Sequence, residues 1–258
     1  MSRNIIFILS HQDDEISIFN KIDKYVKQKK NILIFYLTSG SIKKEIKKKI
    51  KFARDLESIK VLTKLGVKEK NIYFIGRELN IKVYELYKNY DLAFKSISKH
   101  IKKIKNDIII YTHAWEGGNE DHDSCNAITK KLFYNFISIR KCYQFPFYHG
   151  NNMPFIFYRV QNALPHNGIV IKQNVSLINK FRFISYLFFY KSQIKIWFLL
   201  YPFLIFNLFS NKYGIVQNIK KNLNFKKPHK GKLLYEKRGF CDYSVFKKKT
   251  LYFFRSKI

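Results

Sequence analysis

The sequence predicts an α/β fold, in which helices cover both faces of a mostly parallel, Rossmann-like sheet. Short apolar runs rich in Ile, Phe and Tyr have the composition of buried strands. Segments with apolar residues at helical spacing separate these runs, and that alternation is typical of βαβ units with right-handed crossovers. Polar clusters follow several of the runs, at the edge where open α/β sheets place their sites. The runs span residues 5–9, 31–37, 72–76 and 107–112.

The helices expected between these strands each have their own signature. Apolar residues recur at helical spacing over residues 16–30, which predicts a first helix. Residues 44–65 form a basic amphipathic segment that ends before Gly66, a residue suited to the C′ position of a helix. Helical spacing returns between residues 81 and 104, and a further helix is expected over residues 124–136.

The chain beyond Arg140 departs from this alternation. Pro and Gly interrupt short apolar segments there, which we expect to cover the sheet edge and to wall a pocket. Residues 196–210 are densely apolar but shorter than the roughly 20 residues that a spanning helix needs. They form either a buried helix or an interfacial segment that inserts aromatic side chains into a membrane surface.

We expect two parts in the chain, a core at residues 1–180 and a C-terminal extension at residues 181–258 that packs on the core. The extension is rich in aromatic and basic residues and is expected to be largely helical. Near its end, residues 233–235 and 251–254 have the composition of short strands.

The chain is strongly basic, with 49 Lys and Arg against 18 Asp and Glu and a formal net charge of +31. After Asp123, 24 basic residues accompany only Glu236 and Asp242. Such a charge attracts phosphorylated sugars or acidic lipid head groups, although a general preference for Lys on solvated faces explains it equally well. No nucleic acid partner is expected, because no nucleic-acid-binding motif accompanies the charge.

The cysteines and the N-terminus indicate where the protein works. Cys125, Cys142 and Cys241 are far apart and lack any C-x-x-C spacing, which fits a reducing compartment better than a disulfide framework. The first apolar run is too short for a signal peptide and is followed by charged residues. We therefore expect a cytoplasmic protein, with peripheral contact at the inner membrane face as an extension of that expectation.

A histidine and adjacent carboxylates follow the first strand, in the sequence His-Gln-Asp-Asp-Glu at residues 11–15. His11 and Asp14 can converge on one metal ion from a turn that enters a helix. Asp13 faces the same cavity from another angle. The alternative interpretation is an ordinary helix start, because Asp residues there are favoured by capping and by the helix dipole.

A second cluster follows the fourth strand and decides between these interpretations. It runs from His113 through a glycine pair to the sequence Asn-Glu-Asp-His-Asp at residues 119–123. Because parallel strands end at the same sheet edge, His122 is expected close to His11 and Asp14. A zinc hydrolase needs three protein ligands and a base beside the reacting water, and Asp13 remains available as that base.

Together the two clusters resemble the LmbE-like, or PIG-L, family of zinc-dependent N-acetylglucosaminyl deacetylases. The usual motifs of this family are a His-Pro-Asp-Asp-Glu strand end and a Gly-rich loop that closes in His-Pro-Asp-His. The likeness covers most of residues 4–195 and leaves the last 60 or so residues largely outside. Further matching positions are residues 38–40, Arg54, Glu57, residues 65–67 and residues 190–193.

The resemblance implies a role for each matching residue. It implies that His11, Asp14 and His122 bind Zn²⁺. It also implies that Asp13 takes the proton of the attacking water and later returns it to the leaving amine. Arg54 matches a position that contacts the substrate in relatives, although a surface ion pair with Glu57 is the plainer reading of the sequence.

Two positions depart from the family pattern. Gln12 replaces a proline, which removes a fixed φ angle but no reactive group. Asn119 replaces the first histidine of the second motif, which stabilises an oxyanion or acts as an acid. An Asn amide can donate a hydrogen bond to an oxyanion but cannot deliver a proton, so we expect Asn119 to support weaker catalysis. His113 is a candidate to fill the gap at the substrate.

Three functions are compatible with these patterns. The first is a zinc-dependent deacetylase acting on an N-acetylated sugar or sugar conjugate, which includes lipid-linked and polysaccharide precursors. The second is a weakened family member that binds a glycan without hydrolysing it. The third is a peripheral binder of anionic membranes whose basic C-terminal half carries the function. The sequence does not determine the oligomeric state.

Overall fold

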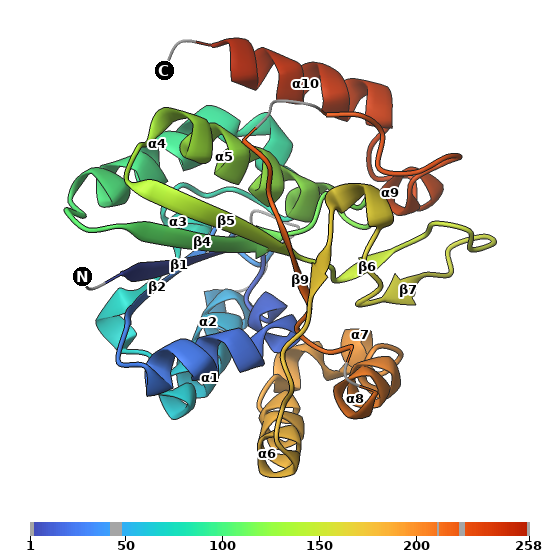
Figure 1. Cartoon of the computed structure of the whole chain (residues 1–258). Coiled ribbons are helices and arrows are strands. Elements are labelled where there is room, and N and C mark those ends of the chain that lie inside the picture. The colour runs from blue at the N-terminus through green and yellow to red at the C-terminus, as the bar shows by residue number, and fades with distance from the viewer. Residues whose placement is uncertain (1–2, 42–47, 211, 222–224, 257–258) are drawn as a thin grey trace.

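The fold is built on a central sheet that combines a parallel body with an antiparallel edge. The computed structural model describes residues 3–41, 48–210, 212–221 and 225–256. Within them, seven strands form one sheet in the order β3-β2-β1-β4-β5-β9-β8. Strands β1 to β5 are parallel, and β9 and β8 add antiparallel pairings beside β5 (Figure 1). The strands are β1 (Asn4–Leu9), β2 (Asn31–Tyr36), β3 (Ile72–Tyr73), β4 (Ile108–His113), β5 (Ile139–Phe145), β8 (Val170–Ile171) and β9 (Val216–Asn218).

Strand β1 lies at the centre of the parallel body and is buried along its whole length. Its side chains alternate between two hydrophobic cores, as successive residues of a strand must. Phe7 and Leu9 pack into one core, and Ile6 and Ile8 pack into the other. A strand that is buried on both faces has a continuous run of apolar residues, and such a run can be recognised in the sequence.

Helices cover both faces of the sheet (Figure 1). One core lies between the sheet and a layer with α1 (Phe19–Lys27), α2 (Lys48–Leu65), α6 (Leu177–Leu187) and α8 (Tyr201–Phe209). The other core lies beneath α3 (Ile75–Glu78), α4 (Tyr90–Lys102), α5 (Glu120–Asn135), α9 (Leu234–Lys237) and α10 (Tyr243–Arg255). The α/β fold class expected from the sequence is therefore confirmed.

Smaller elements complete the chain. A separate hairpin pairs β6 (Tyr148–His149) with β7 (Arg159–Val160). The short helix α7 (Ile194–Trp197) follows the 3-10 turn η5 (Lys191–Gln193). Among the described residues, no helix is both long enough and apolar enough to cross a membrane.

The boundaries of some expected elements differ from the structure. The first helix is divided into a 3-10 turn, η1 (Asp14–Ser17), and α1. The strand expected at residues 72–76 is shorter, because Gly76 already lies in α3 and packs closely on the end of β2. A Cβ atom on Gly76 would lie 2.3 Å from the backbone of Leu37 and Thr38. Residues 44–47 of the expected second helix lie outside the described residues.

The strand-like pieces expected near the C-terminus are wrong. Residues 233–235 run into helix α9, and residues 251–254 belong to helix α10. In α10 the buried side chains recur with a helical period, and they pack over α5 and the second core. The aromatic residues that favoured a strand in the sequence include residues that α10 packs against the second core. Residues 181–258 also contribute β9 to the main sheet, so they share its core.

Candidate active site

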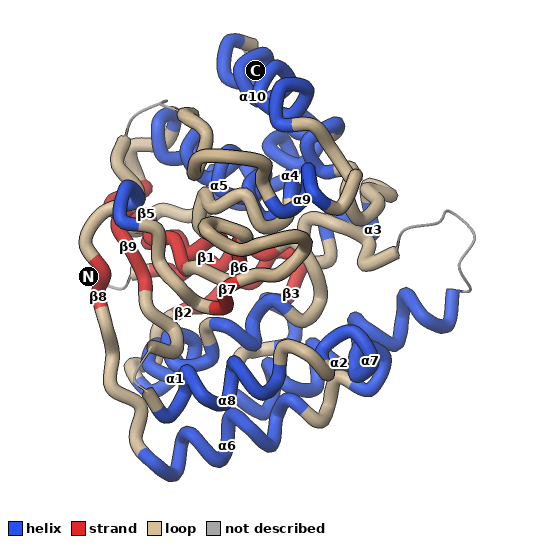
Figure 2. Tube along the Cα trace, turned by 90° about the vertical axis from the view of Figure 1, so that its right-hand side faces the viewer, coloured by secondary structure: helices blue, strands red, loops and turns tan. Residues whose placement is uncertain are grey.

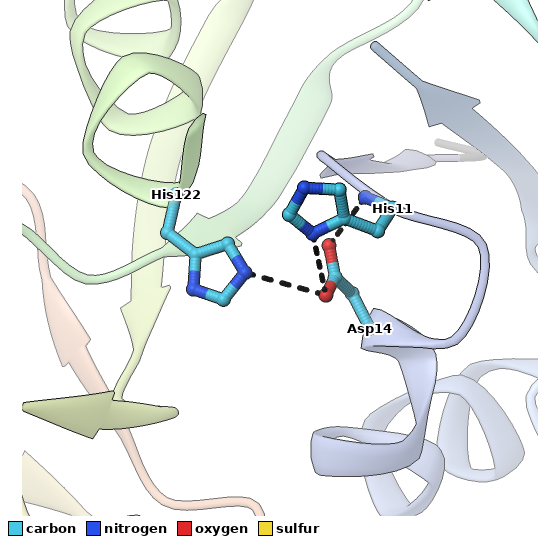
Figure 3. Close-up of side chains that lie close together, drawn as sticks. All are labelled: His11, Asp14 and His122. Carbon is cyan, nitrogen blue, oxygen red and sulfur yellow. Dashed lines mark hydrogen bonds and ion pairs between the residues drawn. The ribbon is translucent and has the colours of Figure 1, made fainter. Parts of the chain in front are cut away.

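The two polar clusters meet at the carboxyl edge of the parallel strands. The first forms the turn between β1 and η1, and the second lies in the loop between β4 and the first turn of α5. His11, Asp14 and His122 point toward one another across this edge (Figure 3). One ligand atom from each lies within 4.8 Å of the others, and all three residues are buried.

The two oxygens of Asp14 have different surroundings. Oδ2 accepts hydrogen bonds from the backbone N–H of His11 at 2.6 Å and from the backbone and hydroxyl groups of Ser10 at 2.9 and 2.7 Å. His113 Nε2 lies 2.9 Å from the same oxygen. Oδ1 instead faces His122 Nε2 at 3.4 Å and His11 Nδ1 at 3.6 Å. One oxygen therefore fixes the carboxylate, and the other is directed at two imidazoles.

His122 has the environment of a metal ligand. Its side chain is buried, yet among the described residues neither ring nitrogen has a hydrogen-bond partner. The ring of His113 stacks on it, with centroids 3.9 Å apart. A buried polar group without a partner is costly, and a cation held between Nε2 and Asp14 Oδ1 would satisfy it.

His11 is held by a carboxylate from behind. Its Nε2 lies 3.1 Å from Asp121 Oδ2, while Nδ1 faces Asp14 and the hydroxyl of Ser10, the latter at 3.0 Å. Burial lowers the pKa of His11, but the carboxylates of Asp14 and Asp121 raise it to about 10. A carboxylate behind a ligating imidazole is the usual outer support of a metal site. These four residues therefore fit a bound cation, which would take the place of the proton on His11.

Asp13 has an unusual backbone conformation. Its φ angle is 150°, a region that residues other than Gly rarely adopt and that is strained by about 1–3 kcal/mol. Arg54 supports it by donating from Nη2 to Asp13 Oδ1 at 3.0 Å and from Nη1 to the Gly40 carbonyl at 3.0 Å. Glu57 accepts from Ser192 instead, so the surface ion pair considered for Arg54 and Glu57 is not formed.

Asn119 caps helix α5 and borders the cavity. Its Oδ1 accepts the backbone N–H of Asp121 at 2.8 Å, which occupies the oxygen in helix capping. The side chain therefore presents its NH₂ group, a donor, toward the cavity.

His113 is placed differently from the substrate position considered for it. It is fully buried, and it does not belong to the cavity lining. Burial and the neighbouring His122 lower its pKa to about 3, so the ring is neutral and donates to Asp14. The geometry gives His113 a supporting place behind Asp14.

The site opens into a cavity of about 390 Å³, a size common for small-molecule sites. Asp13, Asp14, Arg54 and the two ligand histidines line its inner end. The outer wall comes from residues that the sequence did not single out, and they belong to segments distant along the chain. They include Tyr84, Phe147, Tyr148, Phe157, Tyr158, Leu200 and Arg238.

The late motif at residues 190–193 holds the opening turn in place. The Tyr190 hydroxyl donates to Glu15 Oε1 at 2.7 Å, and Glu15 Oε2 accepts the backbone N–H of Asp13 at 3.1 Å. Ser192 binds Glu57 of α2 through its backbone and hydroxyl groups. Tyr190 is therefore connected to the strained residue Asp13 by hydrogen bonds through the side chain of Glu15.

Replacing Tyr190 by Phe should destabilise the protein, and more so at high pH. Burial raises the pKa of Glu15 to about 7, despite the hydrogen bond from Tyr190, so its carboxyl group is mostly neutral at pH 5 and charged at pH 8. A lost donor costs about 1–3 kcal/mol when the buried acceptor is charged. Urea unfolding at the two pH values should show that Tyr190→Phe lowers the free energy of unfolding more at pH 8 than at pH 5. Tyr252→Phe, at an exposed position, should change neither value, and an equal Tyr190→Phe loss at both pH values would contradict this ionisation of Glu15.

Comparison with known proteins agrees with this architecture. The sequence model of the GlcNAc-PI de-N-acetylase (PIG-L) family matches residues 6–133, which contain both clusters. No curated protein matches the sequence.

Solved structures with the same fold include enzymes of two activities. The N,N'-diacetylchitobiose deacetylase of Pyrococcus horikoshii is 17% identical, with a TM-score of 0.61 over 84% of each chain. A deacetylase of teicoplanin biosynthesis is 14% identical, with a TM-score of 0.60 over 85% of this chain and 100% of its own. The 4-carboxy-2-hydroxymuconate hydratase GalB of Pseudomonas putida is 12% identical, with a TM-score of 0.50 over 88% of this chain and 99% of its own.

At these identities the likeness establishes the fold, and the site must establish the chemistry. The family is shown by the match over residues 6–133, together with the motifs that those residues place at the sheet edge. This part of the chain belongs to the PIG-L, or LmbE-like, family.

Proposed function

We propose that this protein is a zinc-dependent deacetylase that hydrolyses the acetamide of an N-acetylated sugar or sugar conjugate. The observation that carries the proposal is the convergence of His11, Asp14 and His122 on the inner end of the cavity, with Asp13 beside them. Family membership and the deacetylases among the similar folds add support.

His11, Asp14 and His122 would hold the metal. When bound there, zinc supplies a Lewis acid that polarises the acetyl carbonyl and makes water a stronger nucleophile near neutral pH. The direction of Asp14 Oδ1 toward His122 Nε2 supports this donor set, as does the absence of a hydrogen bond at either His122 nitrogen within the described residues. His113 and Asp121 would position these ligands by holding Asp14 and His11.

Asp13 would move the proton in the reaction. As the water oxygen bonds to the acetyl carbon, Asp13 takes a proton from that water. It then delivers the proton to the nitrogen as the C–N bond breaks, which releases acetate and the free amine. Arg54 holds Asp13 in place through Oδ1, and the Asn119 amide is a donor on the cavity wall for the negative oxygen of the intermediate.

The outer wall supports a conjugate larger than a bare monosaccharide. Phe157 and Tyr158 provide apolar surface there, and aromatic faces are common partners of sugar rings and of apolar groups. Arg238 brings a guanidinium group to the same wall, with its Cζ 5.5 Å from the centre of the Tyr158 ring. A cation at this position suits a substrate with an anionic group beyond the sugar.

The second candidate is a family member that binds a glycan without hydrolysing it, and Asn119 is the observation that favours it. An acetate-release assay over N-acetyl sugars, free and lipid-linked, separates the two. We expect measurable acetate from the wild-type protein and about a tenfold or greater increase in rate for Asn119→His, which supplies an ionisable donor. Binding is measured in parallel by calorimetry with the same sugars.

The outcomes of this assay are distinct. If the wild-type protein binds an N-acetyl sugar but releases no acetate, while Asn119→His releases it, the binding function is correct. If Asn119→His is slower than the wild type, the amide is better suited to this site than imidazole and the expected role of Asn119 is wrong. Asn135→His, at the end of α5 and away from the site, is the matched control.

A further inference from the structure

Helix α8 is apolar on its exposed side as well as on its buried side. Leu204 and Leu208 pack into the core, but Phe203, Phe206 and Phe209 are 54%, 64% and 43% exposed. The helix contains no charged residue. A helix on the surface of a water-soluble domain normally turns polar residues outward, and one that is apolar all round lies against a second apolar phase.

Helix α6 carries a second set of exposed apolar side chains beside α8. Its buried side chains face the core, whereas Ile178, Phe181 and Phe188 lie exposed one or two turns apart. The two exposed sides join, because the rings of Phe181 and Phe209 have centroids 6.0 Å apart. Figure 2 shows α6 and α8 side by side along one margin of the molecule. We call this surface the aromatic face; it consists of Ile178, Phe181, Phe188, Phe203, Phe206 and Phe209.

The charged residues that helices α6 to α8 and their connections contribute are all basic. The sequence contains no Asp or Glu between Asp123 and Glu236, so none lies on helices α6 to α8 or on their connections. Lys191, Lys195 and Lys212 are exposed in this part of the chain. A Lys nitrogen also lies over the aromatic face, with Lys180 Nζ 5.3 Å from the centre of the Phe209 ring. Apolar side chains framed by cations match a layer that is anionic at its surface and apolar beneath.

The aromatic face continues to the mouth of the cavity. Leu199, which directly precedes the buried Leu200 and α8, is 67% exposed and also lines the cavity. Ile156 and Phe157 line the cavity and are likewise exposed. The apolar surface therefore extends from α6 and α8 to the entrance of the active site.

We propose that the aromatic face binds the surface of an anionic lipid bilayer and holds the cavity mouth against it. The aromatic rings enter the boundary between head groups and acyl chains, and the lysines contact the anionic head groups. The docking itself does not depend on the reaction. If the proposed deacetylase function is correct, this placement gives the cavity direct access to a lipid-linked substrate.

The test is cosedimentation of the full-length protein with vesicles. We expect binding to vesicles made of equal parts phosphatidylglycerol and phosphatidylcholine, and much weaker binding to phosphatidylcholine alone. The double variant Phe203→Ser, Phe206→Ser should bind the anionic vesicles about tenfold or more weakly, because it removes two rings from the apolar contact. Raising the salt from about 0.1 M to about 1 M shortens the Debye length from about 10 Å to about 3 Å and should weaken wild-type binding.

Ile137→Ser is the matched control, since Ile137 is 84% exposed and lies outside the aromatic face. It should bind vesicles like the wild type. Neither Phe203 nor Phe206 lines the cavity, so acetate release from a water-soluble substrate and thermal unfolding should stay unchanged in the double variant. A failure of the reaction is thereby distinguished from a failure of docking.

Three results would overturn the docking proposal. The first is no binding of the wild-type protein to anionic vesicles. The second is equal binding by the wild type and the double variant, which would assign the binding to charge alone. The third is a wild-type dimer that the double variant converts to a monomer, because the aromatic face would then be covered by a second copy of the chain.

Discussion

Asp13→Asn should retain the metal and lose acetate release by about 10²–10⁴-fold, the range that a positioned general base contributes. The substitution removes the ability to take a proton but keeps the shape of the side chain. An Asn oxygen can still accept the hydrogen bond that Arg54 donates at 3.0 Å. Asn has nearly the same size and shape as Asp, so the backbone at this position, with its φ angle of 150°, should persist.

Two controls make this result specific to Asp13. Asp107→Asn changes a carboxylate that pairs with Arg140 away from the cavity, and it should leave the rate unchanged. Metal analysis of Asp13→Asn should match the wild type, because Asp13 is not in the ligand cluster. Acetate release at the wild-type rate from a metal-loaded Asp13→Asn protein would show that another group moves the proton.

His122→Ala should abolish both metal binding and acetate release. His122 is the only member of the ligand cluster that reaches the site from α5, so its loss leaves two ligands on one turn. Two ligands do not hold zinc tightly at a site that is built for three protein ligands. We expect the zinc content to fall from about one per chain to less than about a tenth.

His166→Ala is the control for this substitution, because His166 lies in a 3-10 turn outside the cavity. It should leave metal content and rate unchanged. Circular dichroism of His122→Ala establishes that α5 is still formed. A folded His122→Ala protein that keeps its zinc would remove His122 from the ligand set.

The residues at the centre of the site could be predicted from the sequence, because their positions depend on short spacings along the chain and on the ends of neighbouring strands. Asp14 follows His11 by three residues, and His122 follows a parallel strand that pairs with β1. Parallel strands carry their polar ends to one edge, so two separate clusters were enough to locate the cluster of His11, Asp14 and His122. The roles proposed for these residues stay predictions.

The residues of the outer wall of the cavity could not be predicted from the sequence in this way. Arg238 and Tyr84 are far from both clusters in the sequence, and no spacing rule connects them with β1 or β4. Arg54 illustrates the same limit within the family motif, because its partner is Asp13 rather than the nearby Glu57. Contacts of this kind depend on how helices pack over the sheet, which composition and periodicity do not encode.

The apolar segment at residues 196–210 had two interpretations in the sequence. Residues 196–210 were compatible with a buried helix, the favoured interpretation, and with an interfacial segment, because both are rich in apolar side chains. The structure divides the side chains of α8 between these alternatives, with Leu204 in the core and Phe206 at the surface. Only the three-dimensional structure shows which apolar residues remain exposed on the surface.

The most direct test of the deacetylase account is zinc content measured beside acetate release in three preparations: wild type, Asp13→Asn and His122→Ala. We expect the wild type to carry about one zinc and release acetate, Asp13→Asn to carry zinc without acetate, and His122→Ala to lack both. Acetate release by His122→Ala without zinc, or by Asp13→Asn at the wild-type rate, would contradict the account.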